Sequence, residues 1–405
     1  MGEIKISKPY YECGQGIGRI VSDITCNGEK HRLWYEAEEK YASNLVYERA
    51  DAFLVGLVPY IARFGGKVVS EAPVSAHLLH NLRHLLSPIL PSFHPTFSQL
   101  DINAPSDTSL LNVDGCFNVG TGSSCGIDSM ATLATYFTDV RNERCPVPPS
   151  LKVNTLAFFD VGSHENLIQL AKDREHLAED FARSINLPLV KITSNIADFS
   201  AGFSHIAIHT FRSMSAVLAM QKLFSAYHYA STYPISKFKI SSEDAAYADE
   251  YILRCLSTET TRLYSALAPL SRQGRTDIVA DFEPARNFLN VCVRNIHNCG
   301  LCFKCARTMF QLDLTGKLDK FKNVFDIEAY HKNKKQILKL LAKDNHFHDE
   351  FLSAVKAAPG RSPFSHTRLL TAFTVRNVGT RLIDVRKSLK RKLKLIYNLR
   401  LNKEE

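Results

Sequence analysis

A segment rich in glycine and serine carries residue types that bind phosphate. It reads Gly120-Thr121-Gly122-Ser123-Ser124-Cys125-Gly126-Ile127-Asp128-Ser129 and lies between an apolar stretch and a helical pattern. Glycines let the backbone approach a ligand closely, and the N–H groups at a helix start attract phosphate oxygens. The serine hydroxyls would donate further hydrogen bonds, and Asp128 would either cap the helix or help to hold Mg²⁺. Because no Gly-Lys-Ser/Thr follows, this is not a Walker A loop.

A second group of residues has the spacing of a metal site. Four of the ten cysteines follow the pattern Cys-x6-Cys-Gly-x-Cys-x2-Cys, namely Cys292, Cys299, Cys302 and Cys305. Thiolates at this spacing hold a tetrahedral ion, and Gly300 permits the tight turn between them. Zinc held by four thiolates would be structural, and an iron–sulfur cluster is the alternative. The other six cysteines are scattered, which is typical of small core residues in a reducing compartment.

The elements that must position these residues alternate between strand and helix. Apolar runs predict strands at 116–120, 155–161, 189–193 and 227–231, and helical spacing predicts helices at 129–140, 165–185 and 205–223. This rhythm indicates an α/β fold with a parallel sheet and helices on both faces. Functional residues in such sheets gather at the carboxyl ends of the strands, where the loop at Gly120 to Ser129 would lie.

The length of 405 residues leaves room for more than one domain. Residues 10–38 alternate as short antiparallel strands, 50–64 has helical spacing and ends at Gly65-Gly66, and Ser75 is a good cap for a second helix. We therefore expect an N-terminal α+β unit at 1–105 that helps to select the substrate, a nucleotide-binding domain with the cysteine site at 106–315, and a helical C-terminal extension at 316–405.

Two motifs together resemble a known family. Ser124 to Ser129 resembles the Ser-Gly-Gly-x-Asp-Ser loop of PP-loop ATP pyrophosphatases, with Cys125 replacing the first glycine. A cysteine there leads us to expect an ordinary backbone conformation. The cysteine cluster beyond this loop resembles that of 7-cyano-7-deazaguanine synthases, over roughly 113–312. Between the two motifs, Gly274-Arg275-Thr276-Asp277-Ile278 stands where the family has Thr-Lys-x-Glu-Ile.

The resemblance implies an adenine nucleotide alpha-hydrolase-like fold and an ATP-dependent ligase. Such enzymes attach AMP to a substrate oxygen, release pyrophosphate, and let a nitrogen nucleophile displace AMP, with ATP and Mg²⁺ required. It implies catalytic roles for Asp128, Ser129 and Arg275, the last stabilising charge on the α-phosphate. The implied nucleotide contacts are Gly120, Thr121, Gly122, Ser123, Ser124, Gly126, Asp128, Ser129, Gly162, Ser163 and His164. Because the chain is extended at both ends, we expect a different acceptor, either a nucleobase, a sugar or a protein; the alternative is a non-catalytic nucleotide-binding or assembly protein.

Charge and hydropathy bear on partners and location. The net charge of +9 favours anionic partners, and much of it lies in a basic, leucine-containing tail at 376–403 that would either bind an anionic partner or pack on the protein. His205, His209 and Arg212 share one helical face, which would either contact a substrate or simply pack. No apolar run is long enough to span a membrane, so we expect a cytoplasmic protein.

Overall fold

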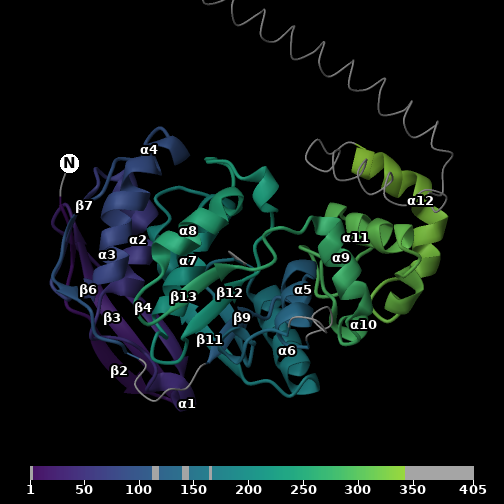
Figure 1. Ribbon diagram of the computed structural model, residues 1–405, viewed down its shortest axis with the longest axis horizontal. Helices are drawn as coiled ribbons and strands as arrows, with labels where there is room; N and C mark the ends of the chain where they lie inside the picture. The colour runs from purple at the N-terminus through teal and green to yellow at the C-terminus, as the bar shows by residue number, and fades with distance from the viewer. Residues whose placement is uncertain (1–2, 112–117, 139–145, 164–166, 343–405) are drawn as a thin grey trace, which may run out of the picture.

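One large sheet runs through the part of the chain that the computed structural model describes, residues 3–111, 118–138, 146–163 and 167–342 (Figure 1). The strands are β1 (Ile4–Ile6), β2 (Tyr10–Gly14), β3 (Ile17–Cys26), β4 (Glu29–Glu38), β5 (Lys67–Ser70), β6 (Val74–Ser75), β7 (Asp101–Asn103), β8 (Ser106–Asp107), β9 (Val119–Gly122), β10 (Thr155–Asp160), β11 (Leu189–Ser194), β12 (Ala226–Tyr229) and β13 (Arg262–Ser265). All but β6 and β8 belong to the large sheet, in the order β13-β12-β9-β10-β11-β4-β3-β1-β5-β7, with β2 paired to β3. The expected mixed α/β fold with a mostly parallel sheet is confirmed.

Helices flank the sheet. They are α1 (Glu39–Ala42), α2 (Asp51–Arg63), α3 (Ala76–Asn81), α4 (Leu90–Phe93), α5 (Ile127–Tyr136), α6 (Ile168–Ser184), α7 (His205–Leu218), α8 (Asp249–Leu256), α9 (Arg272–Asp281), α10 (Ala285–Phe288), α11 (Phe303–Leu314) and α12 (Ile327–Ala342). Shorter helical turns are η1 (Leu82–Leu86), η2 (Ser87–Ile89), η3 (Pro149–Leu151), η4 (Ile196–Phe199), η5 (Ile235–Lys237), η6 (Ala245–Ala248) and η7 (Leu318–Phe321).

Two hydrophobic cores explain the apolar run at 156–159 in strand β10. Neighbouring strand residues point to opposite faces of a sheet. In β10, Leu156 packs into a core with α5, α9 and α11, whereas Ala157 packs into another with α2, α7 and α8. Both faces of this strand are therefore covered, as the unbroken apolar run of its sequence indicates.

Parallel pairing defines the part of the sheet that carries the glycine–serine loop. Strands β13, β12, β9, β10 and β11 pair in parallel with one another. The chain adds β10 and β11 on one side of β9 and then crosses over to add β12 and β13 on the other. The connections on the two sides of β9 therefore lead away in opposite directions. This leaves a crevice beyond the carboxyl end of β9, where ligands bind in sheets of this kind.

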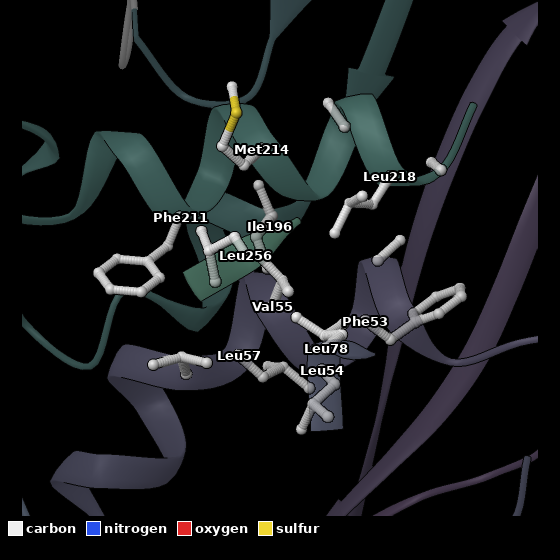
Figure 2. Packing of buried hydrophobic residues seen from close by; sticks show 14 of the residues in the cluster. Phe53, Leu54, Val55, Leu57, Leu78, Ile196, Phe211, Met214, Leu218 and Leu256 are labelled. Atoms are coloured by element: carbon white, nitrogen blue, oxygen red, sulfur yellow. The ribbon is translucent and has the colours of Figure 1, made fainter. Parts of the chain in front are cut away.

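The N-terminal strands continue the same sheet. Strand β4 pairs antiparallel with β11, so residues 3–42 extend the parallel part by hydrogen bonds. Helix α2 packs along α7, and Figure 2 shows Val55 of the first and Leu218 of the second among the apolar side chains buried around this contact. The expected antiparallel strands and helix are present. The proposed domain boundary near 105 stays a prediction, although hydrophobic packing and hydrogen bonds join the two sides.

Local sequence signals set several element ends. The Ser75 hydroxyl accepts a hydrogen bond from the Leu78 N–H and caps α3 as predicted. The turn at Gly16, with a φ of 78°, joins β2 to β3 as a hairpin. At the other end of the described chain, η7 and α12 lie in the predicted C-terminal extension at 316–405 and are helical. The basic tail at 376–403 lies outside the described residues.

Candidate functional site

The glycine–serine loop opens into a cavity of about 430 Å³ at the carboxyl ends of the parallel strands. The loop connects β9 to α5, and the Ser123 N–H donates to the Ala157 carbonyl of β10 across 2.8 Å. Of the predicted nucleotide contacts, Gly122, Ser123, Ser124, Gly126, Asp128, Ser129 and Ser163 line this cavity. The structure thus brings most of the predicted site together.

Gly120 and Thr121 belong to the strand rather than to the cavity lining. A Cβ on Gly120 would lie 2.6 Å from a ring atom of Phe224, so the glycine allows the aromatic core to pack against β9. The Thr121 hydroxyl is buried and donates to the His228 carbonyl of β12 at 2.8 Å. Both residues therefore pack or bond within the sheet at the strand that leads into the loop, and neither lines the cavity.

Cys125 corrects the expectation of an ordinary backbone. Its φ is +54°, in the left-handed region that favours glycine. The side chain is buried in the core formed with α5 and α9, and burial raises the pKa of the thiol to about 12. The loop thus holds Cys125 in a conformation that glycine adopts more easily, with a neutral thiol packed beneath it.

Hydroxyl groups organise the loop and face the cavity. The Ser124 Oγ donates to the Ser129 Oγ at 3.0 Å, and the Ser129 Oγ donates to the Gly126 carbonyl at 3.1 Å. The Ser123 Oγ is buried without a hydrogen-bond partner of good geometry. No side chain caps α5, so Asp128 does not act as its cap. The first-turn N–H groups and the serines are arranged as an anion site would require.

Asp128 lies between two arginines of α9. Its Oδ2 is 2.5 Å from an Arg272 nitrogen, and its Oδ1 is 3.1 Å from an Arg275 nitrogen. Arg275 is fully buried and also donates to the carbonyls of Ser231 and Thr232. Arg272 lines the cavity, whereas Arg275 does not. Arg275, which was predicted to contact phosphate, therefore lies behind Asp128, and the arginine that faces the cavity is one helical turn away.

Three further basic residues that line the cavity were not predicted from the sequence. Arg174 comes from α6, and Lys304 and Arg307 come from α11. Burial lowers the pKa of Lys304, and the nearby charges of Arg272 and Arg307 lower it further. No local pattern marks these residues, because basic side chains on amphipathic helices usually face water. Arg272 alone had a signal, since it precedes the predicted Arg275 by three residues on the same helix.

The end of β10 and the loop that follows it supply another part of the lining. Phe158, Phe159, Val161 and Ser163 face the cavity. Gly162 has a φ of +88°, and a Cβ there would lie 2.5 Å from the Cβ of Ala197, so only glycine fits. The predicted contact His164 lies outside the described residues.

The histidines of α7 separate into two roles. His205 lines the cavity, and its Nδ1 lies 3.5 Å from an Arg212 nitrogen. The His209 Nδ1 is 2.7 Å from the Tyr229 hydroxyl, and its Nε2 is 3.5 Å from Asp244. The predicted face is therefore divided between cavity lining and packing against β12.

The four predicted metal ligands converge beside the cavity. Their sulfur atoms lie within 4.8 Å of one another, and those of Cys299 and Cys305 are 4.0 Å apart. Tetrahedral coordination with metal–sulfur bonds of about 2.3 Å separates sulfurs by about 3.8 Å. Burial raises the pKa of the Cys292 thiol, but backbone N–H groups, including that of Cys299, outweigh it and lower this pKa to about 7. The cluster therefore could hold one metal ion such as zinc.

Residues 290–305, which carry the four cysteines and are called the metal loop, contact the glycine–serine loop directly. The Asn290 N–H donates to the Cys125 carbonyl at 2.8 Å, and Asn290 and Cys292 line the cavity. Arg174 donates to the Cys292 carbonyl at 2.9 Å. A folded metal loop is therefore part of the cavity wall, so loss of a bound metal would disturb the cavity.

Comparisons with models of protein families, with curated proteins and with solved structures found no match for this chain. Among the described residues, no helix is both long and apolar enough to cross a membrane.

Proposed function

We propose that this protein is an ATP-dependent ligase with an adenine nucleotide alpha-hydrolase-like fold, which transfers AMP to a carboxylate or carbonyl oxygen and then joins the activated carbon to a nitrogen nucleophile. The observation that carries the proposal is the glycine–serine loop at the reversal point of the parallel sheet, opening into a cavity with four basic side chains. Loop amides and cations at that position are suited to a polyphosphate. The resemblance to PP-loop enzymes supplies the reaction type.

In this proposal the phosphates lie over the start of α5. The N–H groups of its first turn and the hydroxyls of Ser123, Ser124 and Ser129 bind oxygens of the triphosphate. Arg272 faces the cavity and would neutralise charge that develops at the α-phosphate. Arg275 and Asp128 would position Arg272 rather than touch the nucleotide.

Mg²⁺ would enter this site with ATP. Both carboxylate oxygens of Asp128 already accept hydrogen bonds from arginine, which makes them poor ligands for a metal ion. Phosphate oxygens and water are the usual ligands of nucleotide-bound Mg²⁺. The ion would therefore be held by the nucleotide rather than by Asp128, and it would reduce the charge that the cations must balance.

The adenine would occupy the side of the cavity next to β10. Phe158 and Phe159 offer aromatic surface there, and Val161 and Ser163 follow in the next loop. An apolar wall with a few polar groups is the usual lining of a base pocket. The metal of the cysteine site would be zinc, because four thiolates that are close enough to coordinate one ion tetrahedrally favour it.

The products formed from ATP test the proposal. Metal-loaded protein is incubated with Mg²⁺ and ATP, a panel of carboxylic acids and ammonium chloride, and the products are separated by chromatography. We expect AMP and pyrophosphate, and at least a tenfold loss of rate for Arg272→Gln. Arg183→Gln is the matched control, because Arg183 is an exposed arginine on α6. Formation of ADP and phosphate instead would contradict the proposal, as would failure to bind ATP. Nucleotide binding without turnover for any acid would favour the non-catalytic alternative.

A further inference from the structure

Several basic side chains converge on the cavity. Among the described residues that line it, Arg174, Arg272, Lys304 and Arg307 are basic and Asp128 is acidic. Asp128 accepts hydrogen bonds from Arg272 and from the buried Arg275, both on α9. Arg174 reaches the cavity from α6, and Lys304 and Arg307 reach it from α11.

Positive charges held together in a partly buried cavity repel one another. The repulsion is stronger than on an open surface, because the surrounding protein screens charge less than water does. Arg174, Arg272, Lys304 and Arg307 all line this one cavity, so each adds to the positive potential within it. Binding of an oxyanion between the cations relieves this repulsion. The hydrogen bonds that form between the oppositely charged groups are strong.

The metal loop positions these three basic side chains. Lys304 lies between the ligands Cys302 and Cys305, at the start of α11, and Arg307 lies one turn further on. Arg174 is tied to the same loop through the Cys292 carbonyl at 2.9 Å. The three side chains are therefore carried by or bonded to the metal loop, which is a different segment of the chain from the glycine–serine loop between β9 and α5.

We propose that Arg174, Lys304 and Arg307 form an oxyanion subsite beside the metal loop, distinct from the phosphate loop, that binds a phosphoryl or carboxylate group. The subsite deepens the proposed function and rests on it for the reaction, although anion binding needs no turnover. Its occupant is either the pyrophosphate that leaves ATP or an anionic group of the acceptor. Both present oxyanion oxygens, and the experiment separates them.

Binding of inorganic pyrophosphate tests the subsite directly. Calorimetric titration of the full-length, metal-loaded protein is compared with that of Arg174→Gln, Lys304→Met and Arg307→Gln. We expect each variant to bind pyrophosphate about tenfold or more weakly, because a hydrogen bond to a charged group contributes roughly 1.5–3 kcal/mol. Arg183→Gln is the control, since Arg183 lies on the same helix as Arg174 but is exposed. Arg174→Lys and Lys304→Arg should recover part of the affinity.

A second titration identifies the occupant. The protein is first saturated with Mg²⁺ and α,β-methylene ATP, which cannot release pyrophosphate. If pyrophosphate and inorganic phosphate no longer bind, the subsite holds the terminal phosphates of the nucleotide. If inorganic phosphate still binds and the three variants lose that binding, the subsite receives an anionic group of the acceptor.

Unchanged affinity in all three variants would overturn the subsite, as would failure of the wild-type protein to bind pyrophosphate. Metal content and thermal unfolding are measured for each variant, and an affinity loss that only follows lost metal would also count against it. Failure of the proposed function is a different result. In that case the three cations hold pyrophosphate as expected, but ATP yields no AMP with any acid.

Discussion

Removal of the Asp128 carboxylate is expected to destabilise the fold as well as the site. The side chains of Arg275 and Arg272 are only 1% and 8% exposed, and each bonds to a different oxygen of Asp128. Asp128→Asn would leave two buried guanidinium groups facing a neutral amide. Loss of one partner from a buried ion pair costs about 3–5 kcal/mol, because the remaining charge is desolvated without compensation.

The carbonyl groups around Arg275 moderate this loss. Ser231, Thr232 and Leu267 accept hydrogen bonds from its guanidinium, so that cation keeps part of its solvation without Asp128. Arg272 faces the cavity and can recover some water. We therefore expect Asp128→Asn to lower the free energy of unfolding by about 2–4 kcal/mol, at the lower side of the range for buried pairs.

Urea denaturation provides the assay. Metal-loaded proteins are unfolded in urea, with circular dichroism for the helices and fluorescence of Trp34, the single tryptophan, for the sheet. The matched control is Asp180→Asn on α6, whose partner Arg183 has a side chain that is 76% exposed. An exposed pair contributes at most about 1 kcal/mol, so the control should shift the midpoint little.

The comparison can refute this reasoning. If Asp128→Asn and Asp180→Asn shift the midpoint equally, the buried ion pairs do not stabilise the fold. The double variant Asp128→Asn with Arg272→Gln should be less destabilised than the sum of the single variants, because it leaves one buried charge fewer. Simple additivity would mean that Asp128 and Arg272 act independently.

Three further predictions follow from single features. Because Cys125 has a φ of +54°, Cys125→Gly should be more stable than Cys125→Ala by about 1 kcal/mol in urea denaturation, and the reverse order would exclude a left-handed backbone. The protein should bind one zinc ion per chain by elemental analysis, and Cys302→Ser should lose both the metal and thermal stability; iron, or no metal, would contradict this. Burial raises the pKa of Asp249 to about 6, so ionisation of this carboxylate destabilises the native state above that pH, and the effect disappears as the pH falls below about 4. Asp249→Asn should therefore gain stability relative to the wild type between pH 4 and pH 8, by about 1–3 kcal/mol, and a constant difference would count against the shifted pKa.

The sequence alone determined the α/β class, the position of the glycine–serine loop and the four cysteines that could hold a metal ion. These features are local or periodic. A strand–glycine–helix turn, an apolar run and a Cys-x2-Cys spacing each constrain the backbone over a few residues. For the same reason Ser75 was recognised as a helix cap, and its hydroxyl accepts from the Leu78 N–H at 3.0 Å.

Only the tertiary structure decided which basic residues face the cavity. Arg174 and Lys304 are 130 positions apart, and they meet only because α6 and the metal loop pack on the same side of the phosphate loop. The tertiary structure also placed Arg275 behind Asp128 and turned Arg272 toward the cavity. The side of a helix that faces a cavity depends on what the other sides pack against. The conformation of Cys125 was also beyond the sequence, because a φ that disfavours cysteine persists only where surrounding packing and hydrogen bonds hold it.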